Sequence, residues 1–454
     1  MRSRGSLRLC LAVAALSSAF QGTAALAQTV EVIDLGERYA DPELLQEENL
    51  MVFQTGSAAW IGTIDPATGL FAEGDGRNWL VDPTISSLFD ARNGPEFGLD
   101  RDGWSIFYNE TVNGRVVITR ATPTGPFGSP FARAMLTDVA FDRVNQLPSQ
   151  DASADRTWVL YGRGLPTGFD RDIAYLDELD PMTDLLITPL RPGFAGFRWI
   201  DNTSLLLSTV ADGGPANGQI VLIDAATGDR EIITNDAGTK FDPYGWIAPE
   251  FGGAMLAIAA LDESNIAVYR EAEPFWERIA VLSPPEASGL GFVQSPEPFV
   301  AGGRSYIVTT LKNMPGPVIG GDVTESQIWL YGIDDDPVAR FTLRVDDGAP
   351  GQVRQEGEAF LGENELFIYY NDVRSSGIGL RLTRTGIRLD LDPACQPADL
   401  APPYGTLDQR DTELVLDLLA AGRDDADLNA DGILNVFDLV EMLSVFDACR
   451  SEAR

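Results

Sequence analysis

Short apolar runs separated by polar turns recur along the chain from about residue 45 to about residue 390. Each repeat contains two apolar segments, and Gly, Pro, Asn and Asp are frequent in the turns between them. This pattern is typical of β-strands joined by tight turns. The first members of the seven pairs are residues 50–53, 104–108, 158–161, 204–207, 254–259, 305–309 and 366–370. The second members are residues 59–64, 116–119, 173–176, 220–223, 266–269, 328–331 and 379–382.

The seven pairs repeat at roughly 50 residues, a period in the range expected when each repeat forms one blade of a propeller. No helical periodicity accompanies the repeat. The sequence therefore predicts an all-β propeller. Seven blades are favoured, and six are the alternative.

A second sequence pattern recurs in the same region. Residues 95–104 (PEFGLDRDGW), 249–253 (PEFGG), 296–305 (PEPFVAGGRS) and 357–366 (GEAFLGENEL) each place a phenylalanine before a tight turn and a strand. This arrangement resembles the P-x-(W/F)-S-P-D-G strand start of the WD40-like β-propeller repeats of the TolB family. The resemblance implies a propeller, and no particular activity follows, because that fold hosts many functions.

Two turns share the pattern Ile-Asp-x-Ala-Thr-Gly, at residues 64–69 and 223–228. The aspartate side chain can accept backbone N–H groups, and glycine supplies a positive φ. We expect Asp65 and Asp224 to close outer hairpins as structural residues. A metal-binding turn is the alternative.

The composition changes after residue 392. Two halves follow, at residues 399–411 and 427–438, and each leads into an amphipathic stretch. Apolar residues at i, i+3 and i+4 spacing predict two helices. The predicted helix faces hold Leu414, Leu418 and Leu419 in the first and Leu439, Met442, Leu443 and Phe446 in the second.

The second half carries the ligand spacing of an EF-hand loop, in which hard oxygen donors converge on Ca²⁺ and a glycine permits the sharp turn. The expected ligands, Ile433 through its backbone carbonyl, are Asp427, Asn429, Asp431, Ile433, Asn435 and Asp438. The alternative is an Asp/Asn-rich turn that caps a helix at Asp438. In the first half Asp399, Asp408 and Asp411 remain, but Ala401 and Pro403 replace two donors, so calcium at that loop stays open.

The paired loop-helix halves resemble a dockerin module over residues 395–449. The resemblance implies a small all-α calcium-binding module that docks to a cohesin-like protein or a cell-surface component. We therefore divide the chain into residues 1–27, a signal peptide, residues 28–392, a β-propeller-like domain, and residues 393–454, a dockerin-like module.

The first 27 residues show the pattern of a cleavable secretory signal. Arg2, Arg4 and Arg8 precede an apolar run, and small residues end at Ala27. We expect cleavage near Ala27 and a secreted, extracellular or periplasmic protein. No later stretch is long and apolar enough to predict a transmembrane helix. The mature chain keeps Cys395 and Cys449, which predict one disulfide in an oxidising compartment, with two free thiols as the alternative.

Charge and composition exclude several functions. The net charge of −35 argues against binding nucleic acid or anionic membranes. The chain contains no histidine, which excludes Ser-His-Asp triads, HExxH zinc sites and histidine general bases.

Carboxylates are the remaining candidates for catalysis. Glu96, Glu250, Glu297 and Glu358 lie near the starts of different repeats, so they could converge on a central channel. The alternative is that they bind backbone donors as repeat residues. We therefore weigh two functions. The first is a secreted calcium-binding protein whose dockerin-like module anchors a propeller interaction domain. The second is an extracellular carbohydrate-active hydrolase that acts on a glycan in polysaccharide catabolism.

Overall fold

The computed structural model describes most of residues 30–389 and eight helical residues between 412 and 443. Within 30–389 the residues not described are 38, 88–92, 150–156, 164–171, 179, 182, 184, 188–196, 201–202, 211–213, 317, 319–321, 335–339 and 375–376. The predicted signal peptide, Cys395, Cys449 and both predicted calcium loops lie outside the described residues.

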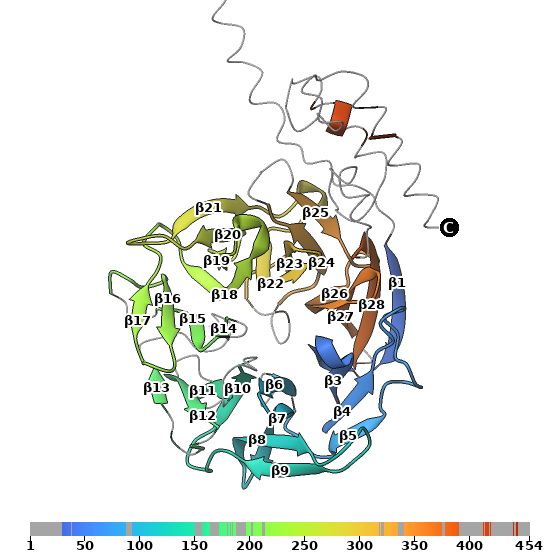
Figure 1. Cartoon of the computed structure of the whole chain (residues 1–454), viewed down its shortest axis with the longest axis vertical. Helices are drawn as coiled ribbons and strands as arrows, with labels where there is room; N and C mark the ends of the chain where they lie inside the picture. The colour runs from blue at the N-terminus through green and yellow to red at the C-terminus, as the bar shows by residue number, and fades with distance from the viewer. Residues whose placement is uncertain are drawn as a thin grey trace, which may run out of the picture.

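Seven four-stranded antiparallel sheets surround a central axis, as the blades of a propeller do (Figure 1). Blade I holds β2 (Ala40–Leu45), β3 (Leu50–Thr55), β4 (Ala58–Thr63) and β5 (Trp79–Asp82). Blade II holds β6 (Glu96–Asp100), β7 (Gly103–Val112), β8 (Arg115–Pro123) and β9 (Phe131–Met135). Blade III holds β10 (Arg143–Pro148), β11 (Trp158–Arg163), β12 (Asp172–Asp177) and β13 (Leu185–Ile187). Blade IV holds β14 (Phe197–Trp199), β15 (Leu205–Thr209), β16 (Ile220–Asp224) and β17 (Arg230–Ile232).

The remaining blades follow the same order from the axis outward. Blade V holds β18 (Lys240–Ala248), β19 (Ala254–Leu261), β20 (Asn265–Arg270) and β21 (Glu277–Leu282). Blade VI holds β22 (Phe292–Ala301), β23 (Arg304–Lys312), β24 (Ser326–Gly332) and β25 (Phe341–Arg344). Blade VII holds β26 (Val353–Leu361), β27 (Glu365–Arg374), β28 (Gly377–Arg388) and β1 (Glu31–Glu37). Three short 3₁₀ turns are η1 (Gln46–Glu48), η3 (Pro249–Phe251) and η4 (Glu286–Ser288).

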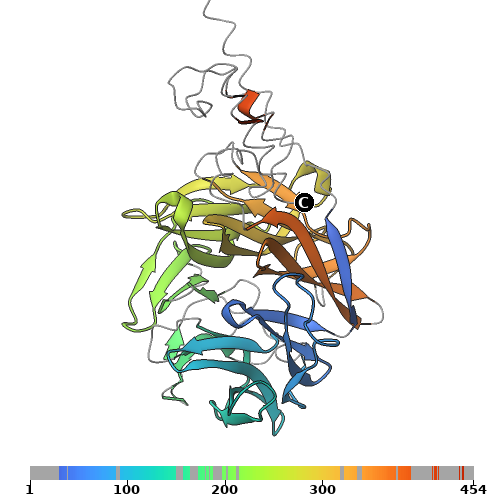
Figure 2. The ribbon, with the colours of Figure 1, turned by 45° about the vertical axis from the view of Figure 1, so that its right-hand side comes forward.

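Blade VII closes the ring with strands from both ends of the propeller. Strand β1 pairs with β28 (Figure 2). Ile33 lies opposite Leu382 in this ladder. Val32, Ile33 and Leu35 are partly buried and pack against the core. The N-terminal strand, which precedes blade I in the chain, is thus held in the last blade by a hydrogen-bonded ladder.

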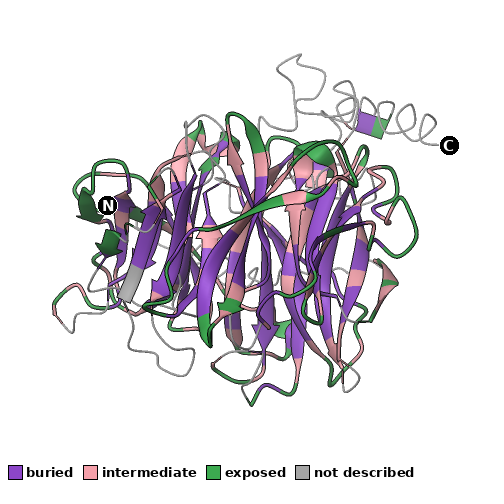
Figure 3. Cartoon of the chain, turned by 90° about the horizontal axis from the view of Figure 1, so that it is seen from below, coloured by how far each residue is buried: buried purple, intermediate pink, exposed green. Residues whose placement is uncertain are grey.

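Apolar side chains fill all seven spaces between neighbouring blades, one hydrophobic cluster to each space. Successive residues of a strand point to opposite faces of its sheet. In blade I, Val52 accordingly packs towards blade II and Phe53 towards blade VII. Because both faces of each sheet are covered, the second strands are buried along most of their length (Figure 3). This double burial explains the near-continuous apolar runs in the sequence.

The structure confirms the seven predicted strand pairs and excludes six blades. The pairs are the second and third strands of the blades, from β3 and β4 to β27 and β28. The two predicted turns are also confirmed as structural. Asp65 accepts the Ala67 N–H and the Thr68 hydroxyl, and Asp224 accepts the equivalent pair from Ala226 and Thr227.

The two lysines of the chain, Lys240 and Lys312, are both buried. The Nζ of Lys240 lies 2.8 Å from Asp236 and donates to Gln219. The Nζ of Lys312 donates to Gln294 at 3.1 Å. Burial lowers the pKa of both amines. Because the chain has no histidine, every other basic side chain is an arginine.

The described residues of the C-terminal region are helical, at 412, 414–416, 418, 439 and 442–443. Val415 and Met442 are buried, and the Thr412 hydroxyl lies 3.9 Å from the Met442 sulfur. In the part of the chain that the structure describes, no helix has the length and apolar character needed to cross a membrane.

Candidate functional site

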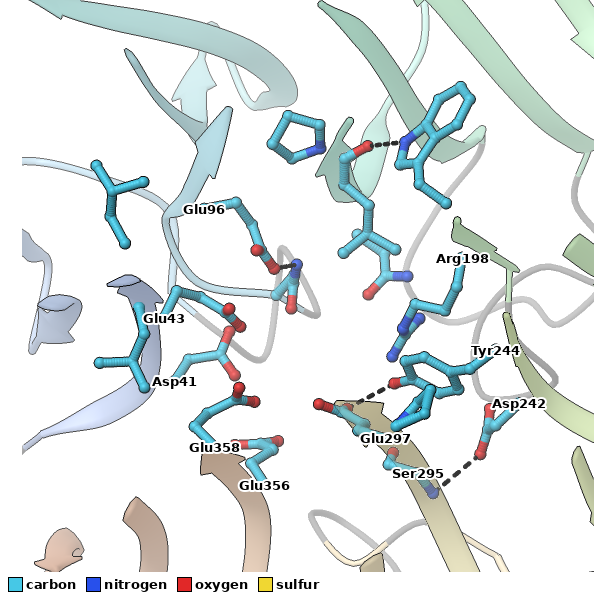
Figure 4. A pocket seen from close by; sticks show the side chains of 18 of the residues that line it. Asp41, Glu43, Glu96, Arg198, Asp242, Tyr244, Ser295, Glu297, Glu356 and Glu358 are labelled. Atoms are coloured by element: carbon cyan, nitrogen blue, oxygen red, sulfur yellow. Dashed lines mark hydrogen bonds between the residues drawn. The ribbon is translucent and has the colours of Figure 1, made fainter. Parts of the chain in front are cut away.

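A central cavity of about 450 Å³ lies among the innermost strands of the seven blades. Its lining is mainly polar. Eight acidic side chains face it, seven of them from innermost strands and the exposed Glu47 from η1. The seven are Asp41, Glu43, Glu96, Asp242, Glu297, Glu356 and Glu358. Figure 4 shows these side chains pointing into one space from different blades.

Bulges in the innermost strands help to place these groups. Five of these strands shift register near the cavity, where an extra residue interrupts the ladder. In each bulge a residue other than glycine has a left-handed φ between 44° and 58°. These five residues all line the cavity, and they are Asp41, Asn145, Asp242, Ser295 and Glu356. Bulges re-aim side chains and are frequent beside functional sites.

Hydrogen bonds hold several of the carboxyl groups. Asp41 accepts the Gly94 N–H, and Glu96 accepts the side-chain amide of Asn93. Glu356 accepts the side-chain amides of Asn371 and Gln355, at 2.8 and 2.7 Å. Burial and the neighbouring carboxyl groups of the cavity raise the pKa values of Asp41 and Glu356.

The carboxyl groups that line the cavity differ in pKa. Burial, reinforced by the charge of Asp41, raises the pKa of Glu96 to about 8. Burial and the neighbouring carboxylates also raise the pKa values of Glu43 and Glu358 well above the ordinary range. Burial raises the pKa of Asp242 to about 6, because Arg198 offsets part of the effect. At neutral pH the cavity therefore presents both carboxylic acids and carboxylates.

Arg198 on β14 is the one basic side chain among the described residues that line the cavity. Its guanidinium lies 4.7 Å from the centre of the Tyr244 ring. The Tyr244 hydroxyl donates to Glu297 at 2.5 Å. Burial alone would lower the pKa of Arg198, but Tyr244 and the carboxylates raise it, so the group stays charged. The three side chains form a polar wall across blades IV, V and VI (Figure 4).

The structure brings together three of the four glutamates selected from the sequence. Glu96, Glu297 and Glu358 line the cavity, while Glu250 does not. The segment that holds Glu250 forms η3, which follows β18, instead of an innermost strand. Glu250 accepts the Ser305 N–H at 3.0 Å. The expected convergence therefore does not extend to Glu250, which binds a backbone donor of the next blade.

The cavity residues that were not selected from the sequence include Asp41, Glu43, Arg198, Asp242, Tyr244 and Glu356. Some of them carry a signal in the sequence, a polar pair at i and i+2 shortly before a long apolar strand. Asp41 with Glu43, Ser295 with Glu297, and Glu356 with Glu358 follow this pattern. The pairs recur with the repeat but carry no apolar periodicity, so strand patterns do not find them.

The described part of the chain contains no group of three or more Cys, Asp or Glu residues arranged to hold a metal ion. The predicted ligands at 427–438 lie outside it.

The fold and the cavity define a seven-bladed β-propeller protein with an acidic centre. No protein-family model matches the chain, and no curated protein matches it in sequence. Solved structures similar to the chain include the Dos1 propeller, at 11% identity and a TM-score of 0.48, covering 78% of this chain and 94% of that one. The Cps50 (Swd1) β-propeller domain of Myceliophteria thermophila matches at 12% identity and a TM-score of 0.45, covering 77% and 98%. The Trypanosoma rangeli sialidase matches at 10% identity and a TM-score of 0.41, covering 79% and 60%.

Proposed function

We propose that the propeller is an extracellular carbohydrate-active hydrolase whose active site is the central cavity. One observation carries this proposal: carboxyl groups from different blades meet in one polar cavity, and their environments divide them into acids and carboxylates. Glycoside hydrolysis needs such a pair, because one group protonates the leaving oxygen while the other acts as base or nucleophile. Because the chain has no histidine, carboxyl groups are the remaining candidates for acid–base catalysis.

Glu96 is the proposed general acid. Its raised pKa keeps the proton on the carboxyl group at neutral pH, and Asn93 orients one of its oxygens. Glu297 is the proposed base or nucleophile. The Tyr244 hydroxyl donates to its carboxyl group at 2.5 Å, and the Arg198 guanidinium lies over the Tyr244 ring.

The test is an activity screen of the full-length protein on plant and algal glycans, followed by the variants Glu96→Gln and Glu297→Gln. Loss of a general acid or base typically lowers kcat by about 10²–10⁴-fold. Each variant should lose activity on this scale on the glycan that the wild type cleaves. Glu250→Gln is the matched control, because Glu250 also belongs to the recurring glutamate pattern but lies outside the cavity. Turnover that survives in both cavity variants would refute the assignment.

The second candidate is a propeller that binds a ligand without turnover. The excess of acidic over basic groups in the cavity favours it, because such a surface attracts cations. Binding of a cationic oligosaccharide with no release of reducing ends would support this alternative over the hydrolase.

We further propose that residues 393–454 form a dockerin-like module that anchors the propeller. Support comes from the helical residues on both sides of the predicted loop and from the contact of Thr412 with Met442. Calorimetric titration of the full chain with Ca²⁺ should give at least one site, and Asp427→Ala combined with Asp431→Ala should abolish it. Unchanged calcium binding in that double variant would contradict the loop assignment. Non-reducing mass mapping of Cys395 and Cys449 tests the proposed disulfide.

A further inference from the structure

Gln146 lies in the bulge of β10, the innermost strand of blade III, where the pairing with β11 shifts register between Val144 and Leu147. Its neighbour Asn145 has a φ of 58° and lines the cavity. Gln146 itself is fully buried and is not among the residues that line the cavity. The bulge therefore directs two successive polar side chains to different places, Asn145 to the cavity and Gln146 to the junction with blade II.

Gln146 binds two successive residues of the segment that leads into blade II. Its side-chain amide donates to the Gly94 carbonyl, and its backbone carbonyl accepts the side-chain amide of Asn93 at 3.0 Å. The same side chain also donates to the Phe107 carbonyl on β7, at 3.4 Å. Its Oε1 is buried with no hydrogen-bond partner among the described residues. The side chain of Gln146 therefore acts in this junction through its donor end.

Asn93 and Gly94 in turn hold two carboxyl groups that point into the cavity (Figure 4). The amide of Asn93 that contacts Gln146 also donates to Glu96 at 2.5 Å, and the Gly94 N–H donates to Asp41. Asp41 lies so close to Gly94 that a Cβ there would be 2.7 Å from a carboxyl oxygen. A shift of Asn93 and Gly94 would therefore move both carboxyl groups.

We propose that Gln146 is a positioning residue of the hydrolase: from blade III it holds Asn93 and Gly94, and through them it sets the positions of the Glu96 and Asp41 carboxyl groups. This inference rests on the proposed function, in which Glu96 is the general acid. Gln146 touches no part of the cavity, so it acts on the reaction only through these neighbours.

The same contacts affect the proton on Glu96. Burial first, and the charge of Asp41 second, raise the pKa of Glu96, while the smaller effect of the Asn93 hydrogen bond lowers it. The Gly94 N–H favours the ionised form of Asp41. If Asn93 and Gly94 move away, Asp41 is more easily protonated and its charge raises the pKa of Glu96 less, so that pKa should fall. The other charged and titratable side chains that line the cavity are Glu43, Glu47, Arg198, Asp242, Tyr244, Glu297, Glu356 and Glu358.

The kinetic test uses the full-length protein and the glycan that the wild type cleaves. Gln146→Met keeps the length of the side chain but removes its donor. We expect kcat to fall about tenfold or more while KM changes less than about threefold, because the substrate does not touch Gln146. The alkaline limb of the pH profile of kcat should move to lower pH by about 0.5 unit or more.

Gln54→Met is the matched control. Gln54 is also buried, its amide donates to the Ser86 carbonyl at 3.0 Å, and its Oε1 likewise has no partner among the described residues. Gln54 does not line the cavity and contacts neither Asn93 nor Gly94. The control should lose stability as Gln146→Met does but keep the pH profile of the wild type.

A second measurement needs no substrate. Urea denaturation between about pH 5 and about pH 9 compares the wild type with Glu96→Gln, and Gln146→Met with the double variant Gln146→Met, Glu96→Gln. In each pair the difference in the free energy of unfolding grows with pH until Glu96 is ionised in the folded protein. This growth should end at a lower pH in the Gln146→Met pair, and at the wild-type pH when Gln54→Met takes the place of Gln146→Met.

An unchanged end point in the Gln146→Met pair would overturn the proposal, as would an equal shift in the Gln54→Met pair. If Gln146→Met does not fold, Gln146→Asn takes its place, because its amide is one methylene too short to reach Gly94. If the wild type cleaves no glycan, the proposed hydrolase fails, whereas the denaturation pairs still decide whether Gln146 positions Glu96.

Discussion

Replacing Glu96 by glutamine should change how the stability of the propeller depends on pH. Glu96 is 7% exposed, and burial raises its pKa from an ordinary 4.5 to about 8. Between these two values the folded protein holds a proton that the unfolded chain has released. The free energy of unfolding therefore falls as pH rises through this window. Glutamine keeps the shape and the oxygen that Asn93 contacts but cannot titrate.

The size of the effect follows from the two pKa values. From about pH 5 to about pH 8, Glu96 removes roughly 3 kcal/mol from the free energy of unfolding of the wild type. The Glu96→Gln variant does not undergo this loss, because glutamine does not titrate. Its stability relative to the wild type should therefore rise by about 3 kcal/mol over the same range, with the larger gain at the alkaline end.

Urea denaturation at several pH values measures the difference directly, since the midpoint and slope give the free energy of unfolding at each pH. The exposed Glu231→Gln on β17 is the matched control, and its curve should run parallel to that of the wild type. Parallel curves for Glu96→Gln and the wild type would refute the assignment of a buried, proton-holding Glu96.

Three further variants test the buried hydroxyl groups and the closure of the propeller. Tyr108→Phe removes the hydroxyl that donates to the buried Asp82 at 2.7 Å and should cost about 2 kcal/mol in urea denaturation. In contrast, Tyr370→Phe should be neutral or stabilising, because that hydroxyl is buried with no hydrogen-bond partner among the described residues. Equal effects of the two variants would contradict this account. Deleting residues 30–37 removes the strand that closes blade VII and the partial burial of four apolar side chains, which should cost about 3 kcal/mol or more and leave β28 as an open edge. An unchanged denaturation midpoint would show that β1 does not support the ring.

The sequence predicted the two middle strands of each blade but not the strands beside the axis. Segments such as β11 and β23 are buried on both faces and read as continuous apolar runs. Strand β14 has three residues, and β2 and β26 contain bulges and charged side chains. These strands break the apolar pattern because they face the cavity. The pairing of β1 with β28 joins residues about 350 positions apart, and no local pattern encodes it.

Only part of the candidate site was predicted from the sequence, because the site lies on these innermost strands. Glu96, Glu297 and Glu358 were found because a phenylalanine and a turn follow each of them in the recurring pattern. Glu250 shares that pattern, but its Pro249 starts a 3₁₀ turn and moves the side chain to the blade junction. Tyr244 and Arg198 meet only because blades IV and V are neighbours in space.

The burial of Lys240 and Lys312 leaves the folded chain without an accessible side-chain amine. Reagents that acylate or cross-link amines should therefore modify the intact protein at its α-amino group alone. Coupling to an amine-reactive support would then attach every molecule by the same end and in one orientation. The two lysines would become reactive as the blades that enclose them unfold, so the extent of acylation at these sites would report the opening of blades V and VI.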